Sequence, residues 1–390
     1  PTHGAPALVQ KRIVKDLDTM YYPESFVVPS TDIVFDRAMI ELFRGCPRGC
    51  RFCQAGHTYR PLRTKSKEVL KQAEAVLKNS GYEEISLSSL STSDYGDLSG
   101  LTECMLDYCE PRHISLSLPS LRADSFSAEL MERVQKTRKS GLTFACEAGT
   151  QRLRDVINKN IREEDVLHAC EIAFQGGWNN VKLYFMMGLP TETYEDLDGI
   201  SDICKKVAYC WRENTPNRAR GVRITASASC FVPKPQTPFQ WDAQDTLEQF
   251  REKQAHMKVV MKTKNVTYNW HDAETSVLEG VIARGDRRQG KAILLAWQRG
   301  CKMDGWDQCF DFDKWMQAFR DCGLDPEFYA SRQRPMDEVF PWDHIGCGTR
   351  KEHLKREWER SREAAITPDC MHQCAGCGAS ALLKGGKCHV

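Results

Sequence analysis

Short apolar runs alternate with amphipathic stretches from about residue 38 onward. The apolar or alternating runs predict six β-strands, at residues 39–43, 85–90, 114–118, 142–146, 181–186 and 224–232. Between them, apolar residues recur three or four positions apart and predict helices, at 66–81, 98–108, 128–137, 150–158, 163–174, 193–212 and 245–264. A regular alternation of strand and helix is typical of a parallel sheet with right-handed crossovers.

The predicted fold class is α/β, with an open or partly closed (β/α) barrel as its main domain. A Rossmann fold fits less well, because no G-x-G-x-x-G motif follows the first predicted strand. Residues 1–37 contain scattered prolines and predict an extension on the surface of the barrel at 38–262. Residues 263–390 carry more tryptophan and shorter helical stretches, and they predict a mainly helical C-terminal domain. In a barrel, the chemistry lies at the carboxyl ends of the strands.

Three cysteines, Cys46, Cys50 and Cys53, follow the first predicted strand directly, with the spacing C-x3-C-x2-C. This spacing lets one short loop wrap three thiolates around an iron–sulfur cluster. A [4Fe–4S] cluster normally has four cysteine ligands, so three leave one iron open. An open iron can bind the amino and carboxylate groups of S-adenosylmethionine (SAM), and an electron from the cluster then cleaves a C–S bond. A structural zinc site is the alternative, although zinc sites more often pair two cysteines with a second, distant pair.

The loop around these cysteines also carries residues that suit a tight, positively charged turn. Gly45 and Gly49 allow unusual backbone dihedrals. Positive charge beside a cysteine favours thiolate over thiol, and this effect is expected from Arg44, Arg48 and Arg51.

The other predicted strands end in residues that suit SAM. The run after the second strand, with Ser91 and Thr92, offers hydroxyl groups and carbonyls to the methionyl ammonium. Arg122, after the third strand, matches the SAM carboxylate, and Glu147, after the fourth, matches the ribose hydroxyls or the ammonium. The alternatives are a turn that caps the next helix for the serine run and a surface salt bridge for Arg122. The full set of candidate cofactor-binding residues is Phe52, Ser91, Thr92, Ser120, Arg122, Glu147, Gly188 and Leu189.

The cysteine motif, with the aromatic Phe52 before its last cysteine, resembles that of the radical SAM superfamily. The resemblance extends to stretches over nearly the whole chain, at 44–56, 87–95, 116–126, 147–154, 188–193, 233–239, 270–272, 278–288, 342–344 and 370–377. More closely, the chain resembles a radical SAM family whose members often carry a B12-binding-like domain ahead of the barrel. The resemblance implies a partial (β/α)6 radical SAM barrel, SAM and a [4Fe–4S] cluster, and no agreed substrate. No D-x-H-x-x-G run that would supply a cobalt ligand occurs in the sequence, which argues against cobalamin.

A second set of cysteines, Cys370, Cys374 and Cys377, repeats the spacing of the first. By analogy of spacing, it predicts a second [4Fe–4S] cluster near the C-terminus. Such a cluster passes electrons, binds substrate or donates sulfur, the last being the role of an auxiliary three-cysteine cluster in methylthiotransferases. Zinc is the alternative, with a fourth ligand from His372, Cys347 or Cys388.

The net charge does not indicate a nucleic-acid-binding protein, because the chain has 54 basic and 53 acidic residues and a formal net charge of +1. No apolar run approaches the roughly 18 residues of a membrane span, and the first residues lack the pattern of a signal peptide. No membrane partner is therefore expected. Eighteen cysteines in a chain of this size fit a reducing, cytoplasmic compartment better than a set of disulfides.

These observations together predict a radical SAM enzyme that makes a 5′-deoxyadenosyl radical at Cys46, Cys50 and Cys53. The radical would modify an RNA, a peptide or a small molecule, with methylation and methylthiolation as candidate outcomes. The expected partners are SAM, the substrate and a reductant protein such as a flavodoxin or ferredoxin. Two other classes compete with this interpretation: a non-catalytic zinc-binding scaffold, and an iron–sulfur electron-transfer protein without a SAM site.

Overall fold

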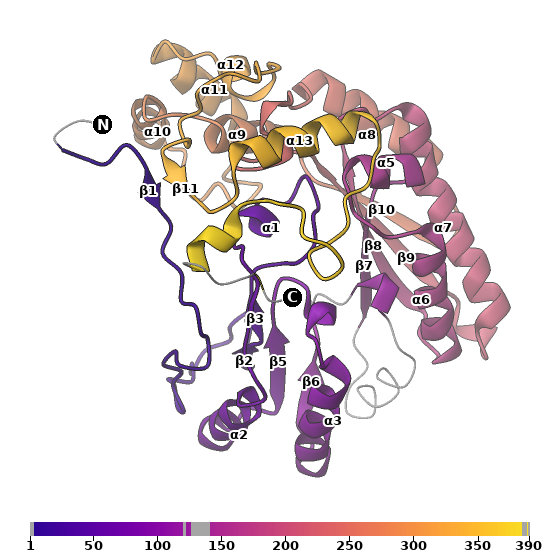
Figure 1. Cartoon of the computed structure of the whole chain (residues 1–390). Helices are drawn as coiled ribbons and strands as arrows, with labels where there is room; N and C mark the ends of the chain where they lie inside the picture. Colours follow the sequence, from indigo (N-terminus) through magenta and orange to yellow (C-terminus); the bar gives the residue numbers. More distant parts are fainter. Residues whose placement is uncertain (1–3, 120–121, 126–140, 384–387, 389–390) are drawn as a thin grey trace.

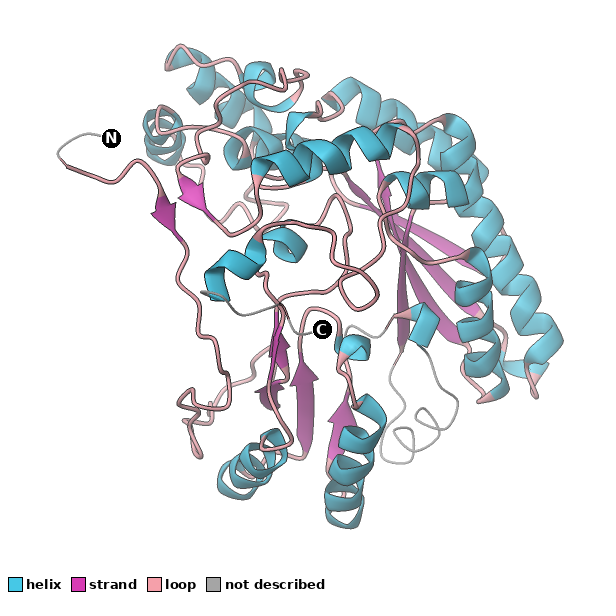
Figure 2. Ribbon diagram, in the orientation of Figure 1, coloured by secondary structure: helices cyan, strands magenta, loops and turns pink. Residues whose placement is uncertain are grey.

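The computed structural model describes residues 4–119, 122–125, 141–383 and 388. Two larger parallel sheets form its centre, and helices cover one face of each (Figures 1 and 2). The three-stranded sheet has the order β2 (Ala38–Glu41), β5 (Glu84–Ser88), β6 (Ser115–Ser117). The four-stranded sheet has the order β10 (Val266–Trp270), β9 (Arg223–Cys230), β8 (Asn180–Met187), β7 (Leu142–Glu147).

These strands confirm the predicted α/β class, and each of the six predicted strands is present. Strand β10 is an addition, because it lies within the stretch 263–390 that the sequence analysis describes as mainly helical. It pairs in parallel with β9, from Val266 beside Ile224 to Trp270 beside Ala228. Its β-branched and aromatic residues favour a strand. The parallel sheet therefore continues past residue 262, where the barrel is predicted to end.

Helices connect the strands as the alternation predicts. They are α2 (Val69–Ser80), α3 (Leu98–Cys109), α5 (Gln151–Val156), α6 (Glu163–Gln175), α7 (Tyr194–Asn214) and α8 (Leu247–Val260). The helix predicted at 128–137 lies outside the described residues. The C-terminal part contains α9 (Ala273–Ala283), α10 (Gln289–Gln298), α11 (Phe312–Asp321), α12 (Pro326–Ala330) and α13 (Lys351–Arg362).

The sheets have one apolar and one polar face. In β8, Val181, Leu183 and Phe185 are buried in the core that the sheet shares with its covering helices. Because side chains alternate along a strand, Lys182 and Tyr184 face the opposite side. Tyr184 is 40% exposed there. The face away from the helices is thus open to a ligand.

Two short strand pairs fasten segments that are distant in sequence. Strand β1 (Val9–Gln10) pairs in parallel with β11 (Ile345–Gly346), which ties the N-terminal extension to the C-terminal part. Strands β3 (Phe43–Arg44) and β4 (Arg63–Thr64) form an antiparallel pair. The first cysteine motif and the short helix α1 (Gln54–Thr58) lie between β3 and β4. This pair therefore closes the base of the cysteine loop.

The end of β7 packs against the first turns of α7 with no room for a side chain at Gly149. An added Cβ would stand 2.2 Å from the carbonyl oxygen of Asp196 and 2.4 Å from the amide nitrogen of Ile200. Both are backbone atoms of a helix, so neither can swing aside as a side chain would. The next residue, Thr150, caps α5, since its hydroxyl oxygen accepts from the Leu153 amide at 3.2 Å. This contact fixes where the end of β7 lies.

We expect Gly149→Ala to lower the free energy of unfolding by about 2 kcal/mol or more, since overpacking a tight site costs about 1–3 kcal/mol and occasionally more. Urea denaturation followed by circular dichroism measures this change. Gly96→Ala is the matched control, because Gly96 is exposed and no atom lies within 4 Å of an added Cβ. Equal stability of the two variants would contradict the close contact between β7 and α7.

Candidate active site

The three cysteines of the first motif lie in one loop between β3 and α1. Cys46, Cys50 and Cys53 are half-buried and carry free thiols. The Cys53 sulfur caps α1 by accepting from the Gly56 amide at 3.4 Å. Burial, together with the neighbouring Cys50, raises the pKa of Cys46 to about 12, and burial also raises the pKa of Cys53. Three soft thiol donors from one loop fit an iron–sulfur cluster, whose positive irons would hold them as thiolates.

The loop can make this turn because Gly45 has the left-handed backbone conformation, with φ +95°. An added Cβ at Gly45 would stand 2.8 Å from the carbonyl oxygen of Pro61. The predicted role of glycine at this position is therefore consistent with the backbone. It also brings the loop against the segment that precedes β4.

The three arginines of the loop all form ion pairs. Each of them is paired with a carboxylate: Arg44 with Glu41 at 2.7 Å, Arg48 with Asp94 and with Asp369 at 2.7 Å, and Arg51 with Glu357 at 3.1 Å. Their charges are thus compensated locally, and the pKa of Cys46 is raised rather than lowered. The sequence alone does not show where these acidic partners lie, and the expected effect of the arginines on the thiols stays a prediction.

Arg51 is the central connection of the loop. Its side chain is fully buried and donates to the carbonyl oxygens of Val156 at 2.9 Å and Ala365 at 2.6 Å. It also donates twice to Oε2 of Glu357, at 3.2 Å and 3.1 Å. Thr367 donates to the same carboxylate at 2.8 Å. One guanidinium therefore joins the cysteine loop to the end of α5, to α13 and to the chain beyond α13.

Asn158 makes a second connection beside Arg51. Its side-chain amide donates to the carbonyl oxygens of Gly49 and Thr367, both at 3.1 Å. Its Oδ1 accepts from the Thr367 amide at 2.8 Å. A Cβ at Gly49 would stand 2.8 Å from the Asn158 amide nitrogen, so glycine is needed for this approach. The loop and the segment around residue 367 are thus held together by fully paired polar groups.

Glu147, at the end of β7, lies beside the cysteine loop. Its backbone is left-handed, with φ +67°, next to an irregularity in the pairing of β7 with β8. Its carboxylate accepts from Nζ of Lys159 at 2.9 Å. Burial lowers the pKa of Lys159, but the charges of Glu147 and, to a smaller extent, Cys50 raise it above its ordinary value. Strained residues of this kind are often found at functional sites, and here the strained residue places a carboxylate near Cys53.

Arg122 lies near this pair. Its guanidinium is paired with Asp124 at 2.9 Å and donates to the carbonyl oxygen of Asn160 at 3.2 Å. It is 9% exposed. The alternative of a surface salt bridge does not match this arrangement, because the ion pair is largely buried. Contact with SAM stays a prediction for Arg122.

The hydroxyl groups after β5 serve the loop itself. Ser91 donates to Oδ2 of Asp94 at 2.6 Å, and Asp94 is the carboxylate that binds Arg48. Thr92 is fully buried, and its hydroxyl lies 2.9 Å from that of Ser89. These side chains belong to a turn, but Asp97 rather than the serine run caps the next helix, α3, by accepting from the Gly100 amide at 3.1 Å. Contact with SAM stays a prediction for Ser91 and Thr92. Ser120 lies outside the described residues.

The remaining candidates lie around one apolar cluster at the ends of β7, β8 and β9. Leu189 is buried there with Phe231 and Phe239, and Phe52 packs against this group from the cysteine loop. Gly188 has φ +82°, and its amide donates to Glu192 at 2.8 Å. These contacts fix the position of the loop after β8. Backbone contact with adenine stays a prediction for Gly188 and Leu189.

The second cysteine set lies against the first loop. The amide of Cys370 donates to the carbonyl oxygen of Pro47 at 2.9 Å. In Figure 1, the yellow C-terminal segment passes close to α1. Among the described residues, no three His, Cys, Asp or Glu side chains are arranged as ligands of a single metal ion, at either cysteine set. This observation concerns single ions, whereas the ligands of an iron–sulfur cluster surround a larger group.

Several residues of the site are missing from the sequence analysis. No sequence motif includes Lys159, Asn158 or Arg60. Lys159 donates to the Glu147 carboxylate, whereas Asn158 and Arg60 donate to backbone carbonyl oxygens of distant residues. The charged residue Lys159 follows directly after the predicted helix at 150–158, which is the one signal that could have drawn attention to it.

Comparison with known proteins identifies the family. Residues 40–203, which include the cysteine loop and β5 to β8, match the model of the radical SAM superfamily. The chain belongs to this superfamily. The predicted superfamily and the predicted enzyme class are thereby confirmed, and this superfamily implies SAM and a [4Fe–4S] cluster.

The relatives of this radical SAM chain are longer than the chain. It is 31% identical to an uncharacterized protein of Methanocaldococcus jannaschii over 287 residues, which are 73% of this chain and 60% of the relative. It is 22% identical to a tRNA-2-methylthio-N(6)-dimethylallyladenosine synthase of Pelotomaculum thermopropionicum over 283 residues, 68% of this chain and 58% of the relative. The chain therefore spans about three fifths of the length of these relatives.

Among solved structures, the chain is similar to the radical SAM methyltransferase TsrM of Kitasatospora setae, with cobalamin and a [4Fe–4S] cluster bound. The TM-score is 0.39 and the identity 14%, over 49% of this chain and 36% of that one. In the described part of the radical SAM chain, every helix is too short or too polar to cross a membrane.

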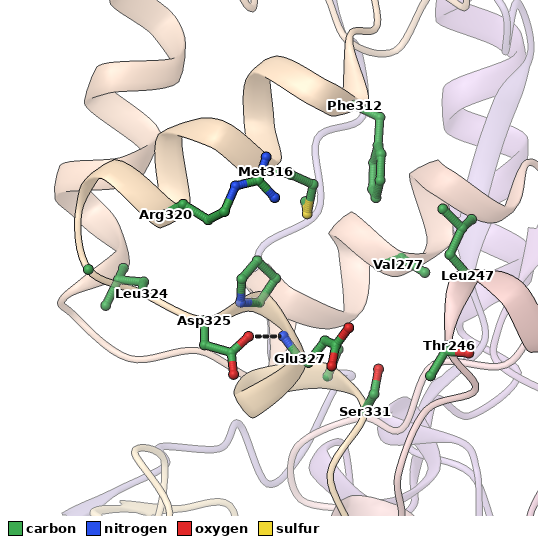
Figure 3. A pocket seen from close by; sticks show the side chains of 13 residues that line it. Thr246, Leu247, Val277, Phe312, Met316, Arg320, Leu324, Asp325, Glu327 and Ser331 are labelled. Carbon is green, nitrogen blue, oxygen red and sulfur yellow. Dashed lines mark hydrogen bonds between the residues drawn. The ribbon is translucent and has the colours of Figure 1, made fainter.

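A pocket of about 580 Å³ lies among α9, α11, α12 and the start of α8 (Figure 3). Apolar side chains such as Phe312 and Met316 line it together with the charged Arg320 and Glu327. The Glu327 amide donates to Asp325 at 2.9 Å, as the dashed line in Figure 3 marks. The lining contains none of the cysteines and none of the strand-end candidates, so the pocket is separate from the cluster site.

The buried pair of Arg51 and Glu357 allows a direct test. We expect Arg51→Met to lower the free energy of unfolding by about 3–5 kcal/mol, because it leaves the Glu357 carboxylate buried without a partner. Adding Glu357→Gln removes that charge and should recover part of the loss. Denaturant titration of both variants measures the effect.

Arg44→Met is the control for this test, because the Arg44–Glu41 pair is about one-third exposed. Pairs of that kind contribute about 0–1 kcal/mol. A loss in Arg51→Met no greater than in Arg44→Met would show that the buried pair does not hold the loop.

Proposed function

We propose that this chain reductively cleaves SAM at a [4Fe–4S] cluster held by Cys46, Cys50 and Cys53. When bound, the cluster supplies one electron that breaks a C–S bond of SAM, and the resulting 5′-deoxyadenosyl radical abstracts a hydrogen atom from the substrate. The observation that carries the proposal is the Glu147–Lys159 ion pair, which lies beside the cluster ligands at a strand end. An electron-transfer protein without a SAM site has no need of such a pair.

This pair suits the amino acid part of SAM. The methionyl group carries an ammonium and a carboxylate. Glu147 offers an anionic partner to the ammonium, and Lys159 offers a cationic partner to the carboxylate. Both side chains are largely shielded from water, with 15% and 11% exposure, so their charges are only weakly screened. Arg122 adds a second cation near Lys159. In this proposal Phe52 packs beside the cluster, and the backbone at Gly188 and Leu189 flanks the adenine.

The open face of the sheet favours a polar substrate. In parallel register, Thr143 lies beside Lys182, and Tyr184 lies beside Ser227. Thr225 lies between Lys182 and a threonine of β10. Most of these side chains lie in the amino-terminal halves of β7, β8 and β9, so the hydroxyl groups and the lysine would bind a polar part of the substrate that is remote from the cysteine loop.

We further propose that the product is a methylated or methylthiolated RNA base. Two curated relatives support this choice, since one is named as a tRNA-2-methylthio-N(6)-dimethylallyladenosine synthase and the other as a threonylcarbamoyladenosine tRNA methylthiotransferase. Methylthiolation needs a sulfur source, and the second cysteine set is where this proposal places a second iron–sulfur cluster. The reductant is a one-electron donor protein of the flavodoxin or ferredoxin type. Cobalamin is not part of the proposal.

The first test is anaerobic reconstitution with iron and sulfide, followed by iron analysis and a dithionite-driven assay for 5′-deoxyadenosine. We expect about eight irons and 5′-deoxyadenosine from the wild type, because each cubane cluster holds four irons. Cys46→Ala/Cys50→Ala/Cys53→Ala should retain about four irons and form no 5′-deoxyadenosine. A colourless, zinc-loaded wild type that leaves SAM intact would overturn the proposal in favour of a zinc-binding scaffold.

A second test addresses the ion pair. We expect Glu147→Gln and Lys159→Met each to raise the Kd for SAM about tenfold or more at unchanged iron content. A charge-assisted hydrogen bond contributes about 1.5–3 kcal/mol, and 1.4 kcal/mol corresponds to a factor of ten. Equilibrium dialysis of the reconstituted variants with labelled SAM measures this Kd.

Lys205→Met is the control for SAM binding, because Lys205 forms an exposed pair with Asp202 at 3.0 Å on α7. Its Kd for SAM should equal that of the wild type. If Glu147→Gln and Lys159→Met also bind SAM like the wild type, the pair is structural and SAM lies elsewhere.

A further inference from the structure

A cavity of about 310 Å³ lies on the polar face of the four-stranded sheet, at the amino ends of its strands. Strands β7, β8 and β9 all contribute to it. Two cations, Lys182 and Arg223, line this amino-end cavity together with Thr143, Asn180 and Thr225. Among the described residues, no aspartate or glutamate is part of its lining. The polar groups that it offers to a ligand are therefore either positive or neutral.

The register of the sheet places these five side chains next to one another. Thr143, Lys182 and Thr225 are direct neighbours on three adjacent strands. Asn180 and Arg223 form the neighbouring pair that lies two residues closer to the amino ends of β8 and β9. Adjacent strands lie about 4.8 Å apart, and alternate residues of a strand share one face. A single small group in the cavity is thus within reach of donors from all three strands.

Both cations keep their charge uncompensated within the part of the chain that the structure describes. Neither Lys182 nor Arg223 forms an ion pair with a described residue. The Lys182 ammonium instead lies 4.6 Å from the centre of the Tyr184 ring, a contact that orients an ammonium without cancelling its charge. By contrast, Lys159 and Lys253, near the carboxyl ends of the strands, are each paired with a carboxylate at 2.9 Å. The amino-end cavity is therefore suited to an anion.

Phosphate is the anion that this set of donors suits best. Arginine, lysine, threonine and asparagine are all side chains that contact the phosphates of nucleic acids. A guanidinium can bind two phosphate oxygens at once, and an ammonium adds a point charge. The oxygens of a phosphate point in tetrahedral directions, whereas those of a carboxylate lie in one plane. Donors that approach from three strands match the first arrangement better.

The cavity lies on the same sheet face as the proposed SAM site and at a defined distance from it. Glu147 lies beside Phe185, which is three residues further along β8 than Lys182. At about 3.3 Å per residue, this separation is about 10 Å along the strands. Between the two levels, Ser227 lies beside Tyr184 and Asn269, so the connecting surface is polar. One nucleotide has a length of this order from its base to its phosphate.

We propose that the amino-end cavity binds a backbone phosphate of the RNA substrate, with Lys182 and Arg223 as its cationic partners. This inference rests on the proposed function, because the base to be modified has to lie at the other end of the same sheet face. Phosphate contacts fix the position of a nucleic acid but do not read its sequence. The cavity thus sets how far the substrate enters, and other contacts select the base.

The anion site itself is tested with inorganic phosphate, by isothermal titration calorimetry of the reconstituted full chain. We expect Lys182→Met and Arg223→Gln each to raise the Kd for phosphate about tenfold, since each removes a charge-assisted hydrogen bond. Lys205→Met is the matched control, because it removes the same charge from α7 on the other face of the sheet and should bind phosphate like the wild type. Equal Kd values in all these proteins, or no saturable binding by the wild type, would overturn the site.

The source of the phosphate is tested with a short labelled single-stranded RNA, by fluorescence anisotropy at several salt concentrations. We expect Lys182→Met to raise the Kd for this RNA about tenfold. It should also reduce the slope of log K against log salt by about 0.7, which is the contribution of one phosphate contact on a single strand. Arg223→Gln, at a more exposed position, repeats the measurement if Lys182→Met does not fold. Weakened binding of inorganic phosphate with unchanged binding of RNA would overturn the RNA assignment in favour of a small phosphorylated molecule.

The proposed function is judged separately, by dithionite-driven 5′-deoxyadenosine formation in the wild type. A wild type that forms no 5′-deoxyadenosine would overturn the proposed function, whereas the Kd values for phosphate would still decide the anion site. A wild type that forms 5′-deoxyadenosine, with variants that bind phosphate and RNA unchanged, would overturn the amino-end cavity alone.

Discussion

A single buried ion pair, between Arg51 and Glu357, sets the arrangement of the site. Arg51 lies between Cys50 and Cys53, and Glu357 lies on α13 near the far end of the chain. Taking two charges out of water is expensive unless both are fully hydrogen-bonded. That condition is met here, because carbonyl oxygens of two other segments and the Thr367 hydroxyl complete the network. All of these groups are paired in the structure, and the contacts tie the cysteine loop to α5 and α13.

This constraint couples the two ends of the domain. The chain that leaves α13 passes Ala365 and Thr367, both of which bind the network, and reaches Asp369 and Cys370 directly afterwards. The second cysteine set is therefore positioned by the same contacts that hold the first loop. A change that loosens α13 would disturb both cysteine sets. Cluster content and docking of the C-terminal segment should accordingly behave as one property of the fold.

The sequence predicts local features of this chain well and long-range ones poorly. The six strands and the cysteine motif follow from spacing within a few residues. By contrast, Ser91 and Thr92 suit a ligand in isolation but are used by the turn that presents Asp94 to Arg48. The charge of Arg51 is cancelled by a residue 306 positions away. No local pattern can show such a partner.

The same limit applies to strand β10. Its residues favour a strand, but its neighbouring tryptophan-rich segments suggest a new domain. Only the pairing of Val266 with Ile224 shows that the sheet continues. Where a domain ends is thus decided by hydrogen bonds to an earlier strand, which composition does not reveal.

The Glu147–Lys159 pair allows two charged groups to be largely buried at the end of β7. Each group alone would be costly to bury, but the two satisfy one another at 2.9 Å. In the proposed complex, the ammonium of SAM would pair with Glu147 and its carboxylate with Lys159, so the total charge of the site would not change. Binding would then require separation of one ion pair rather than the burial of a new charge, and a zwitterionic ligand would be favoured over one that carries a single charge.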